Sequence, residues 1–539
     1  MKPASLLASL IATAQAGDPR RCAPFYFSNL TVFGTEVLDV TTKVQLQYTT
    51  NTTYRVGLDP AVLRPIDFCN VTVSFTHPGW DDLVHVYVWL PLNGKWNERY
   101  MSVGGGGLVT GGEGALAQPV QMGYAAANTD GGHSVFGTFA ELSNSTSWSL
   151  TSPGNTNWYG INDFASRAIG DLPKFGKGVV ERFYGVSPKF SYWAGCSTGG
   201  RQGLMSAQRY GTDHDGILAA SPAINWDVFS PAGFWPQVVM FEKKYWPSQC
   251  EFEALRQAAI EACDGLDGVM DGVIAAQWLC KFDARQVVGR RLSCAGEERR
   301  ISRDAAEVAN RIWEGPRERD GRWIWYGNTY DTPTSVKLGL TTLGLANTEC
   351  DDDQRQCYGV PFPVTADVIR NWIVKDPSYD TSNMDEDALR AVIMRSKNEF
   401  ASVIGTSDPD LTEFKEAGGK MITWHGIADQ LIPENGTVNY YERVEAFDPH
   451  VRDYYRFFEA PGVFHCAGGA GPNPTGVFDA LVKWVEQGVA PDTLHARTLP
   501  SNTTNSTMER PLCLYPLVAA YKGGNVNDAA SYTCAETYV

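Results

Sequence analysis

Several common sequence patterns are absent from this chain of 539 residues. No stretch after residue 16 reaches 18 uninterrupted apolar residues, so no membrane-spanning helix is predicted. None of the 12 cysteines forms a C-x-x-C pair, so a common spacing of zinc ligands is absent from the chain. There is no internal repeat and no low-complexity tract, so a repeat architecture is excluded.

Positive charge is also scarce. Lys and Arg number 45 against 61 Asp and Glu, which gives a formal net charge of -16 and a pI near 5.0. Nucleic-acid affinity depends mainly on Lys and Arg side chains that displace counterions from phosphates, so no nucleic-acid partner is expected. With 43% hydrophobic residues the chain can bury a large core, and a globular protein with small, neutral substrates fits better.

The first 16 residues, MKPASLLASLIATAQA, have the pattern of a cleaved secretory signal peptide. They begin with a basic residue, continue through a short apolar run and end in a small-x-small triplet. We therefore expect a secreted, extracellular protein whose even number of cysteines forms disulfides. Seven sequons would accept glycans on surface loops, at Asn29, Asn51, Asn70, Asn144, Asn435, Asn502 and Asn505.

Strand patterns followed by glycine turns recur through the first part of the chain. Residues 82–90 alternate as a strand does, and the apolar runs before the glycines at 104, 131 and 195 repeat this pattern. A helical segment at 203–210 and a buried strand at 216–223 follow. Strand, turn, helix and strand in this order predict a parallel sheet in an α/β fold.

The pattern changes near residue 225. The segment to about 405 is rich in Trp, Cys and Asp and carries short helical patterns, so we expect an inserted, mostly helical unit at 225–405. Sheet patterns resume at 418–433 and 453–466. The predicted core is therefore discontinuous and consists of residues 17–224 and 406–539.

A candidate nucleophile lies in Gly195-Cys196-Ser197-Thr198-Gly199, which fits the pattern G-x-S-x-G. The glycines permit a sharp turn between a strand and a helix that lifts the serine hydroxyl out of the sheet. The alternative is a glycine-rich turn with an unreactive serine. The apolar strand before the motif and the helix after it favour the nucleophile.

A serine hydroxyl becomes nucleophilic when a histidine takes its proton and a carboxylate orients that histidine. Among the five histidines after Ser197, His465 lies in a glycine-bearing loop behind a strong strand near the end of the chain. It is therefore the predicted base. The other four are typical of turn, loop or surface positions: His214, His425, His450 and His495.

The predicted acid is Asp429, which directly follows a strand pattern. Asp448 and Asp453 lie in a charged stretch before the histidine strand and are less favoured. An ordinary turn aspartate is the alternative for Asp429. The order Ser, acid, His along the chain is the one found with a G-x-S-x-G turn.

Two cysteines adjoin the predicted catalytic residues, because Cys196 precedes Ser197 and Cys466 follows His465. If the hydroxyl and the imidazole lie within hydrogen-bond reach, the two sulfurs come within disulfide range. We therefore predict a Cys196–Cys466 bond that holds the two catalytic loops together and limits their misplacement.

The oxyanion of acyl transfer needs fixed hydrogen-bond donors. The first expected donor is the backbone N–H of Thr198, the residue after the nucleophile. A second donor is expected from the glycine run 104–107, with Gly105 and Gly106 as candidates. A plain tight turn is the alternative. No Gly-Lys-Ser/Thr follows the run, so a phosphate-binding loop is not predicted.

Three carboxylates, of Asp264, Asp267 and Asp271, lie within eight positions of the insertion and alternate with glycines. Oxygen ligands and tight turns suit calcium, whereas zinc favours nitrogen or sulfur. The loop lacks the closing glutamate of an EF-hand, so it would be a different kind of site. An acidic surface turn is the alternative.

These motifs together resemble the tannase and feruloyl esterase family of secreted fungal and bacterial hydrolases, and the fungal feruloyl esterase B branch in particular. The resemblance rests on GGGG, GCSTGGRQG, CDGLDGVMDGVI, HGIAD, GVFHC and VKWVEQGVAP, which span most of the chain after residue 16. It implies an α/β-hydrolase core with a lid at 225–405, in which Ser197, Asp429 and His465 form the triad. The loop AGGAGPNP after the histidine is shorter than the family pattern.

The resemblance also implies a structural calcium in the lid, held by the side chains of Asp264, Asp267 and Asp271 and by the carbonyls of Val269 and Val273. Five further disulfides are expected as local bridges: Cys22–Cys69, Cys250–Cys294, Cys263–Cys280, Cys350–Cys357 and Cys513–Cys534.

The activity implied is that of a serine carboxylesterase acting on phenolic-acid esters. Its substrates would be feruloyl or other hydroxycinnamoyl esters of plant cell-wall polysaccharide. A tannase acting on galloyl esters is the first alternative. A noncatalytic carbohydrate-binding relative and a secreted peptidase are the others.

Overall fold

The structure is a computed structural model that describes residues 17–50, 57–133, 142–338, 341–499 and 507–538. The expected signal peptide and the sequons at Asn51, Asn502 and Asn505 lie outside the described residues. The chain forms two compact units. The first comprises residues 1–142, 158–217 and 412–419, and the second comprises residues 143–157, 218–411 and 420–539. The boundaries of these two units differ from those of the predicted core (17–224 and 406–539) and lid (225–405), and that division stays a prediction.

Six strands of the first unit are hydrogen-bonded in the order β1-β2-β3-β5-β4-β8. The series from β1 to β5 is antiparallel, whereas β5, β4 and β8 run parallel to one another. The strand expected at 82–90 is β3, which buries alternate valines against the core. The bounds are β1 Glu36–Tyr48, β2 Ile66–Thr76, β3 Val84–Pro91, β4 Arg99–Val103, β5 Ala125–Thr129 and β8 Phe190–Cys196.

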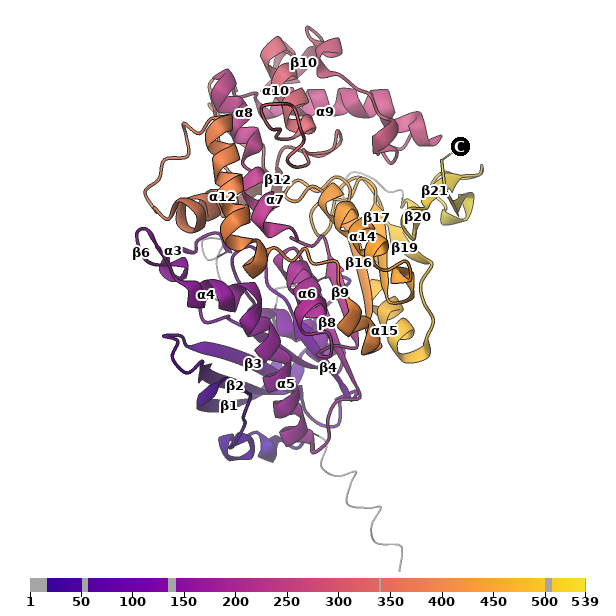
Figure 1. The fold of residues 1–539 in the computed structure, drawn as a ribbon. Coiled ribbons are helices and arrows are strands. Elements are labelled where there is room, and N and C mark those ends of the chain that lie inside the picture. Colours follow the sequence, from indigo (N-terminus) through magenta and orange to yellow (C-terminus); the bar gives the residue numbers. More distant parts are fainter. Residues whose placement is uncertain (1–16, 51–56, 134–141, 339–340, 500–506, 539) are drawn as a thin grey trace, which may run out of the picture. The chain divides into compact units, whose positions relative to one another are not determined.

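Helix α5 covers one side of these strands and packs against β3, β4 and β5 (Figure 1). Gly176 permits the close approach, because a Cβ at this position would lie 2.3 Å from the Tyr100 hydroxyl oxygen. Helix α6 follows β8 directly and packs against it. The helical segments are α1 Ala117–Gln121, α4 Trp158–Asn162, the π-helical turn η4 Asp163–Arg167, α5 Ala168–Tyr184, α6 Thr198–Arg209 and α13 Thr412–Glu416.

His214, expected at the surface, is instead buried in the first unit with 3% of its surface exposed. Its Nδ1 lies 3.1 Å from the Ser206 hydroxyl of α6, and its Nε2 lies 3.0 Å from the Ser102 hydroxyl of β4. The ring also meets the edge of Trp193 in β8. The histidine therefore ties together the three elements that surround the serine turn, which the sequence pattern alone did not reveal.

In the second unit, strands β16 and β17 are parallel, with Gly426 opposite Ala460. The N–H of Ser221, just after β9 (Gly216–Ala220), donates to the Trp424 carbonyl at 2.8 Å. Helix α15 packs against β16, and two small sheets follow toward the C-terminus. The bounds are β16 Lys420–Gly426, α14 Asn435–Phe447, β17 Tyr455–Ala460, β18 Asn473–Thr475, α15 Val477–Gln487, β19 Thr493–Arg497, β20 Glu509–Cys513, β21 Val518–Tyr521 and β22 Tyr532–Ala535.

Within its described residues, the segment 225–405 contains six α-helices and three short hairpins, and the rest is short helical turns and irregular loops. Three of its helices, α9, α10 and α12, begin at polar caps: the side chains of Ser248, Ser302 and Asp385 each accept a backbone N–H. The helices are α7 Trp226–Ala232, α8 Trp235–Lys243, α9 Gln249–Cys263, α10 Arg303–Glu314, α11 Pro363–Asp367 and α12 Glu386–Ile404. The hairpins are β10 Arg291–Cys294 with β11 Glu297–Arg300, β12 Val336–Leu338 with β13 Thr341–Leu343, and β14 Thr348–Cys350 with β15 Cys357–Gly359.

The five local disulfides are confirmed, and each lies within one unit. They are Cys22–Cys69 in the first unit and Cys250–Cys294, Cys263–Cys280, Cys350–Cys357 and Cys513–Cys534 in the second. No helix within the described ranges is long and apolar enough to cross a membrane.

The prediction that the sequons lie on surface loops is only partly right. Asn29 and Asn144 are exposed and lie outside helices and strands. Asn70 lies within β2, where its amide donates to Glu113 at 3.0 Å, and Asn435 is the first residue of α14. A sequon is a three-residue pattern and carries no information about the strand or helix that contains it.

The buried His214 predicts a specific pH dependence of stability. Burial, and to a lesser extent the charge of Lys177, lowers the pKa of His214 well below its ordinary value of 6.5. Below pH 6.5 the unfolded chain binds a proton at this site that the folded chain does not, so this contribution to stability falls as the pH falls. We expect His214→Gln to reduce the slope of unfolding free energy between pH 6.5 and 5 by up to about 1.4 kcal/mol per pH unit.

Urea unfolding at several pH values would measure these slopes. The exposed His450, changed to Gln, is the matched control and should leave the slope unchanged. An unaltered slope in His214→Gln would show that this histidine protonates in the folded protein.

Candidate active site

Ser197 stands at a strained turn between β8 and α6. Its backbone has φ 63° and ψ -124°, an unusual conformation for a residue with a side chain. The flanking glycines make this turn possible, because a Cβ on Gly195 would lie 2.3 Å from the Gly199 carbonyl oxygen. This is the geometry expected for a serine raised above the end of a strand.

The glycine run 104–107 packs directly beside this turn in the first unit. A Cβ on Gly104 would lie 2.5 Å from the Cα of Gly199, so position 104 requires glycine, and a Cβ on Gly199 would have a tight contact of 3.0 Å with the Gly105 carbonyl oxygen. The N–H of Gly199 donates to the Gly105 carbonyl at 3.1 Å, and the Thr198 hydroxyl donates to the Gly107 carbonyl at 2.6 Å. The run therefore holds the start of α6 in place.

The amides of the two glycines predicted as oxyanion donors have other partners. Gly105 N–H donates to the side-chain oxygen of Gln202 at 2.9 Å, and Gly106 N–H donates to the Val109 carbonyl at 3.1 Å. Gln202 is fully buried. The sequence did not reveal this role for the glutamine, because its partner lies 97 positions away.

Asp429 and His465 meet in the second unit. His465 Nδ1 lies 2.7 Å from Asp429 Oδ2, and its backbone N–H donates to the side chain of Gln430 at 3.1 Å. The two side chains stand on the loops that follow β16 and β17, and the parallel pairing of these strands brings the loops together. The sequence placed both residues after strands, which is why their proximity was predictable.

The Asp429 carboxylate is almost fully buried, with 1% of the residue's surface exposed, and is surrounded by hydrogen-bond donors. Oδ1 accepts the N–H groups of Leu431 and Ile432 at 2.8 and 2.9 Å. Burial alone would raise the pKa of Asp429, but the charge of His465 and the hydrogen bonds from His425 and His465 outweigh it and hold the pKa well below its usual range. The group is therefore an ionised acceptor that orients the imidazole.

A second histidine, His425, also contacts Asp429. Its Nε2 lies 3.1 Å from the same Oδ2, and its Nδ1 lies 2.9 Å from the Thr437 hydroxyl. The side chain is fully buried at the end of β16. Sequence reasoning treated His425 as a residue before a turn. The spacing of four between His425 and Asp429 was visible, but a strand end followed by a turn does not by itself predict contact.

Ser197 belongs to the first unit, whereas Asp429 and His465 belong to the second. The contact of the serine with the histidine and the bond between Cys196 and Cys466 therefore stay predictions. All 12 cysteines lie in the described ranges, and none is a free thiol.

The acidic loop of the insertion is a compact turn in the second unit. Asp264 accepts the N–H groups of Asp271 and Gly272 at 3.1 and 2.9 Å, and Asp267 accepts that of Val269 at 3.0 Å. Asp271 also pairs with Arg510 at 2.8 Å. The Cys263–Cys280 bond closes the loop from outside.

The three carboxylates interact electrostatically, although their oxygens do not all lie within 4.8 Å of one another. Burial and, in addition, the charges of Asp271 and Asp264 raise the pKa of Asp267 to about 6. Arg510 is the only basic side chain for which the structure gives an ion pair with this loop, within the described residues. Oxygen donors in excess of positive charge, on a glycine-rich turn, fit a hard cation such as calcium.

Known proteins share both the sequence and the fold of this chain. The family model described as tannase and feruloyl esterase matches residues 69–535. A probable feruloyl esterase of Arthroderma benhamiae is 40% identical over 479 residues, 88% of this chain and 86% of that protein. A tannase of Aspergillus oryzae is 27% identical, over 90% of this chain and 89% of that protein. The solved structure of a tannin acyl hydrolase from Aspergillus niger matches with a TM-score of 0.83 and 28% identity, over 96% of this chain and 95% of that one.

A strained serine between a parallel strand and a helix, and an aspartate–histidine pair after two further parallel strands, are features of a carboxylic ester hydrolase with the α/β-hydrolase fold. The match to the family model covers most of the described chain. The chain belongs to the tannase and feruloyl esterase family.

The shared carboxylate predicts different effects for the two histidines. His425→Gln removes one donor from Asp429 Oδ2 but leaves His465 and both backbone donors, so we expect kcat on 4-nitrophenyl acetate to fall about tenfold with little change in KM. His450→Gln is the exposed control and should be unchanged. Steady-state kinetics would measure both. A loss as large as in His465→Gln, or no loss at all, would contradict a positioning role for His425.

Proposed function

We propose that the protein is a secreted serine carboxylesterase that hydrolyses phenolic-acid esters, with Ser197, Asp429 and His465 as its catalytic triad. The observation that carries the proposal is the hydrogen bond from His465 Nδ1 to the buried Asp429 carboxylate. The strained backbone of Ser197 supports the same assignment from the first unit.

In the proposed reaction, His465 Nε2 takes the proton of the Ser197 hydroxyl as Oγ bonds to the ester carbonyl carbon. Collapse of the tetrahedral intermediate breaks the bond to the alcohol oxygen, and His465 returns the proton to that oxygen. A water molecule then attacks the acyl-enzyme by the same route and releases the phenolic acid. Asp429 keeps the imidazole in one tautomer and stabilises its protonated form.

The oxyanion would be held by the backbone N–H of Thr198 and by an amide of the glycine run. Gly105 and Gly106, the two glycines first considered, donate their N–H groups to other acceptors, and Gly104 donates to the Ala194 carbonyl at 3.0 Å. We therefore assign the second donor to Gly107. Its carbonyl accepts the Thr198 hydroxyl, which keeps the two residues adjacent.

A bond between Cys196 and Cys466 would link the residue before the nucleophile to the residue after the base. The proposal is supported by the absence of a free thiol among the cysteines, all of which lie in the described ranges. Such a bond would limit the relative motion of the serine and the histidine.

The proposed acyl group is feruloyl or a related hydroxycinnamoyl group, carried by plant cell-wall polysaccharide. The 40% identity to a probable feruloyl esterase, against 27% to a tannase, favours this over galloyl esters. Secretion is supported by the signal-peptide pattern of residues 1–16 and by the oxidised cysteines. Glycosylation is proposed for the exposed Asn29 and Asn144.

A structural calcium is proposed for the acidic loop. Asp264, Asp267 and Asp271 would supply carboxylate oxygens, and Val269 and Val273 would supply carbonyls. Calcium would neutralise the three carboxylates and stabilise the turn. The loop would take no direct part in the ester chemistry.

The substrate proposal can be tested with methyl ferulate, methyl gallate and a peptide substrate. Wild type should hydrolyse the ferulate fastest, and Ser197→Ala should lose activity by about a thousandfold or more, because no other hydroxyl replaces the nucleophile. The variant should unfold at the same temperature as wild type. Retained activity would refute Ser197 as the nucleophile, and a preference for gallate would establish the tannase alternative.

The calcium proposal predicts a measurable loss of stability on chelation. Removing a cation that binds only the folded protein lowers stability by mass action, so EGTA should lower the melting temperature of wild type by at least about 3 °C. Asp264→Asn should no longer respond to EGTA or to added calcium. Elemental analysis after mild dialysis provides the stoichiometry. If wild type contains no calcium and its melting temperature does not change with EGTA, the proposed calcium site is wrong.

A further inference from the structure

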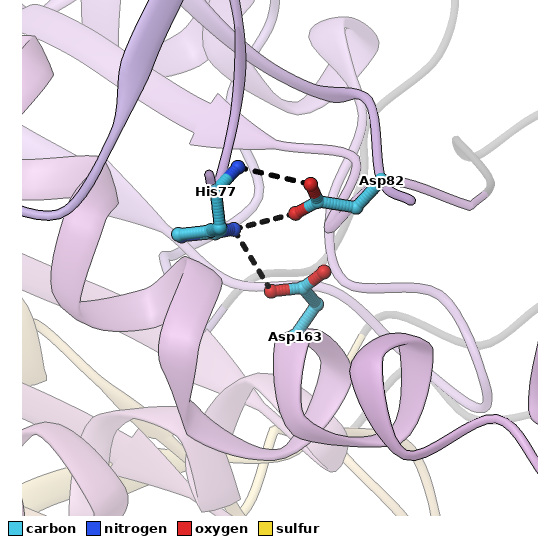
Figure 2. Close-up of side chains that lie close together, drawn as sticks. All are labelled: His77, Asp82 and Asp163. Atoms are coloured by element: carbon cyan, nitrogen blue, oxygen red, sulfur yellow. Dashed lines mark hydrogen bonds and ion pairs between the residues drawn. The ribbon is translucent and has the colours of Figure 1, made fainter. Parts of the chain in front are cut away.

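A buried polar cluster lies in the first unit, apart from the residues assigned above. Figure 2 shows the side chains of His77, Asp82 and Asp163 converging on one point. His77 follows β2, Asp82 lies in the loop before β3, and Asp163 is the first residue of η4. Two neighbouring residues of one loop and a third residue about 80 positions later therefore place one imidazole nitrogen and two carboxylates together, with ligand atoms within 4.8 Å of one another.

Asp82 is fixed toward the imidazole. One of its oxygens accepts the Thr76 hydroxyl at 2.7 Å and the backbone N–H of His77 at 2.9 Å. Its other oxygen lies 2.5 Å from His77 Nδ1. The side chains of both residues are buried, with 4% and 6% of their surface exposed.

Asp163 is the member of the cluster whose environment is incomplete. Only 1% of the residue is exposed, and its Oδ1 has no hydrogen-bond partner within the described part of the chain. The oxygen points at His77 Nδ1 from 3.8 Å, too far for a hydrogen bond (Figure 2). A buried carboxylate oxygen without a partner is costly, so its position calls for a ligand between it and the ring.

The rest of the cluster resembles the outer shell of a metal site. The second ring nitrogen of His77 lies 3.0 Å from Asp171 Oδ2, and metal-bound histidines commonly donate their other N–H to a carboxylate in this way. Arg167 Nε–H lies between two acceptors: it is 3.0 Å from the same ring nitrogen and 3.1 Å from Asp171 Oδ2. When a metal takes the lone pair of Nδ1, Nε2 carries the proton and donates it to Asp171, and Arg167 then donates to Asp171 instead of to the ring.

The carboxylates of the cluster outnumber its permanent cations. Asp82, Asp163 and Asp171 face a single guanidinium, that of Arg167. Without a metal, protons balance the charge: burial lowers the pKa of His77 but hydrogen bonds to Asp171 and Asp82 outweigh it and raise that pKa above 6.5, and burial raises the pKa of Asp163 to about 8. A divalent cation would bind here in place of these protons.

We propose that His77 Nδ1, Asp82 Oδ2 and Asp163 Oδ1 bind a divalent transition-metal ion such as Zn²⁺. An imidazole nitrogen with two carboxylates suits such an ion, whereas calcium would take oxygen ligands alone. Bonds of about 2.0–2.2 Å would bridge the 3.8 Å gap between His77 and Asp163, and Asp82 would move slightly away from the ring.

The consequence is structural and reaches the nucleophile helix. Segment η4, which begins with Asp163, also holds Arg201 of α6: the guanidinium donates to the carbonyls of Phe164 and Ala165 at 2.9 and 2.7 Å. Arg201 is fully buried and lies four residues after Ser197. A metal on Asp163 would stabilise the segment against which the start of α6 is anchored.

The test is metal binding by the full mature chain without a polyhistidine tag, after treatment with a chelator. Calorimetric titration with ZnCl₂ should show one more equivalent bound by wild type than by Asp163→Asn, or affinity at least about tenfold higher. Asp82→Asn should behave like Asp163→Asn. Cobalt should give a visible absorption band in wild type that both variants lose.

Two control variants separate this site from others on the protein. Asp320→Asn, at an exposed carboxylate, and His450→Gln, at an exposed histidine, should bind zinc as wild type does. Added zinc should raise the melting temperature of wild type and of these controls only. Equal zinc binding by wild type and Asp163→Asn, or no stoichiometric binding by chelator-treated wild type, would overturn the proposal. These readouts do not depend on esterase activity, so they are independent of the proposed substrate.

Discussion

The hydrogen bond between His465 Nδ1 and the buried carboxylate of Asp429 is the interaction on which the chemistry of this protein depends. With Nδ1 committed to the carboxylate, the lone pair of a neutral imidazole lies on Nε2, where a serine proton can be accepted. The carboxylate stays ionised in its buried position because two backbone amides and His425 also donate to it. The pairing of β16 with β17 sets the distance between the two loops, since Gly426 and Ala460 are opposite each other at the strand ends.

In the first unit, buried hydrogen bonds likewise fix the position of the serine. A strained residue persists only where its surroundings fix it in several ways, and Ser197 is followed by a helix start held through the glycine run, Gln202 and Trp193. The Trp193 indole donates to the Gly199 carbonyl at 2.9 Å, and His214 joins the neighbouring strand and helix. Both halves of the proposed triad are therefore supported by buried, hydrogen-bonded polar side chains rather than by apolar packing alone.

The sequence allowed prediction of features that are carried by local patterns. The serine turn was visible as glycines around a serine after an apolar strand, and Asp429 and His465 as polar residues after strands. The five local disulfides, which join cysteines 7 to 47 positions apart, were expected from the even number of cysteines in an oxidised chain. The helices within 225–405 were indicated by short amphipathic patterns, such as those at 302–313 and 385–400.

Features that depend on long-range partners were not predictable in the same way. The bond from Gly105 to Gln202, the burial of His214 and the approach of Asp163 to His77 and Asp82 all join segments that no sequence period relates. The sequence shows the residue types at these positions, but burial and hydrogen-bond partners arise only when the segments pack. The acceptors of the Gly105 and Gly106 amides were not predictable for the same reason.

Covalent labelling with diisopropyl fluorophosphate tests the role of the Asp429–His465 pair most directly. Peptide mass spectrometry should find the phosphoryl group on Ser197 of wild type, and His465→Gln and Asp429→Asn should label at least about a hundredfold more slowly. Modification of a different residue, or labelling of Ser197 at the wild-type rate in either variant, would contradict activation of this serine by the aspartate–histidine pair.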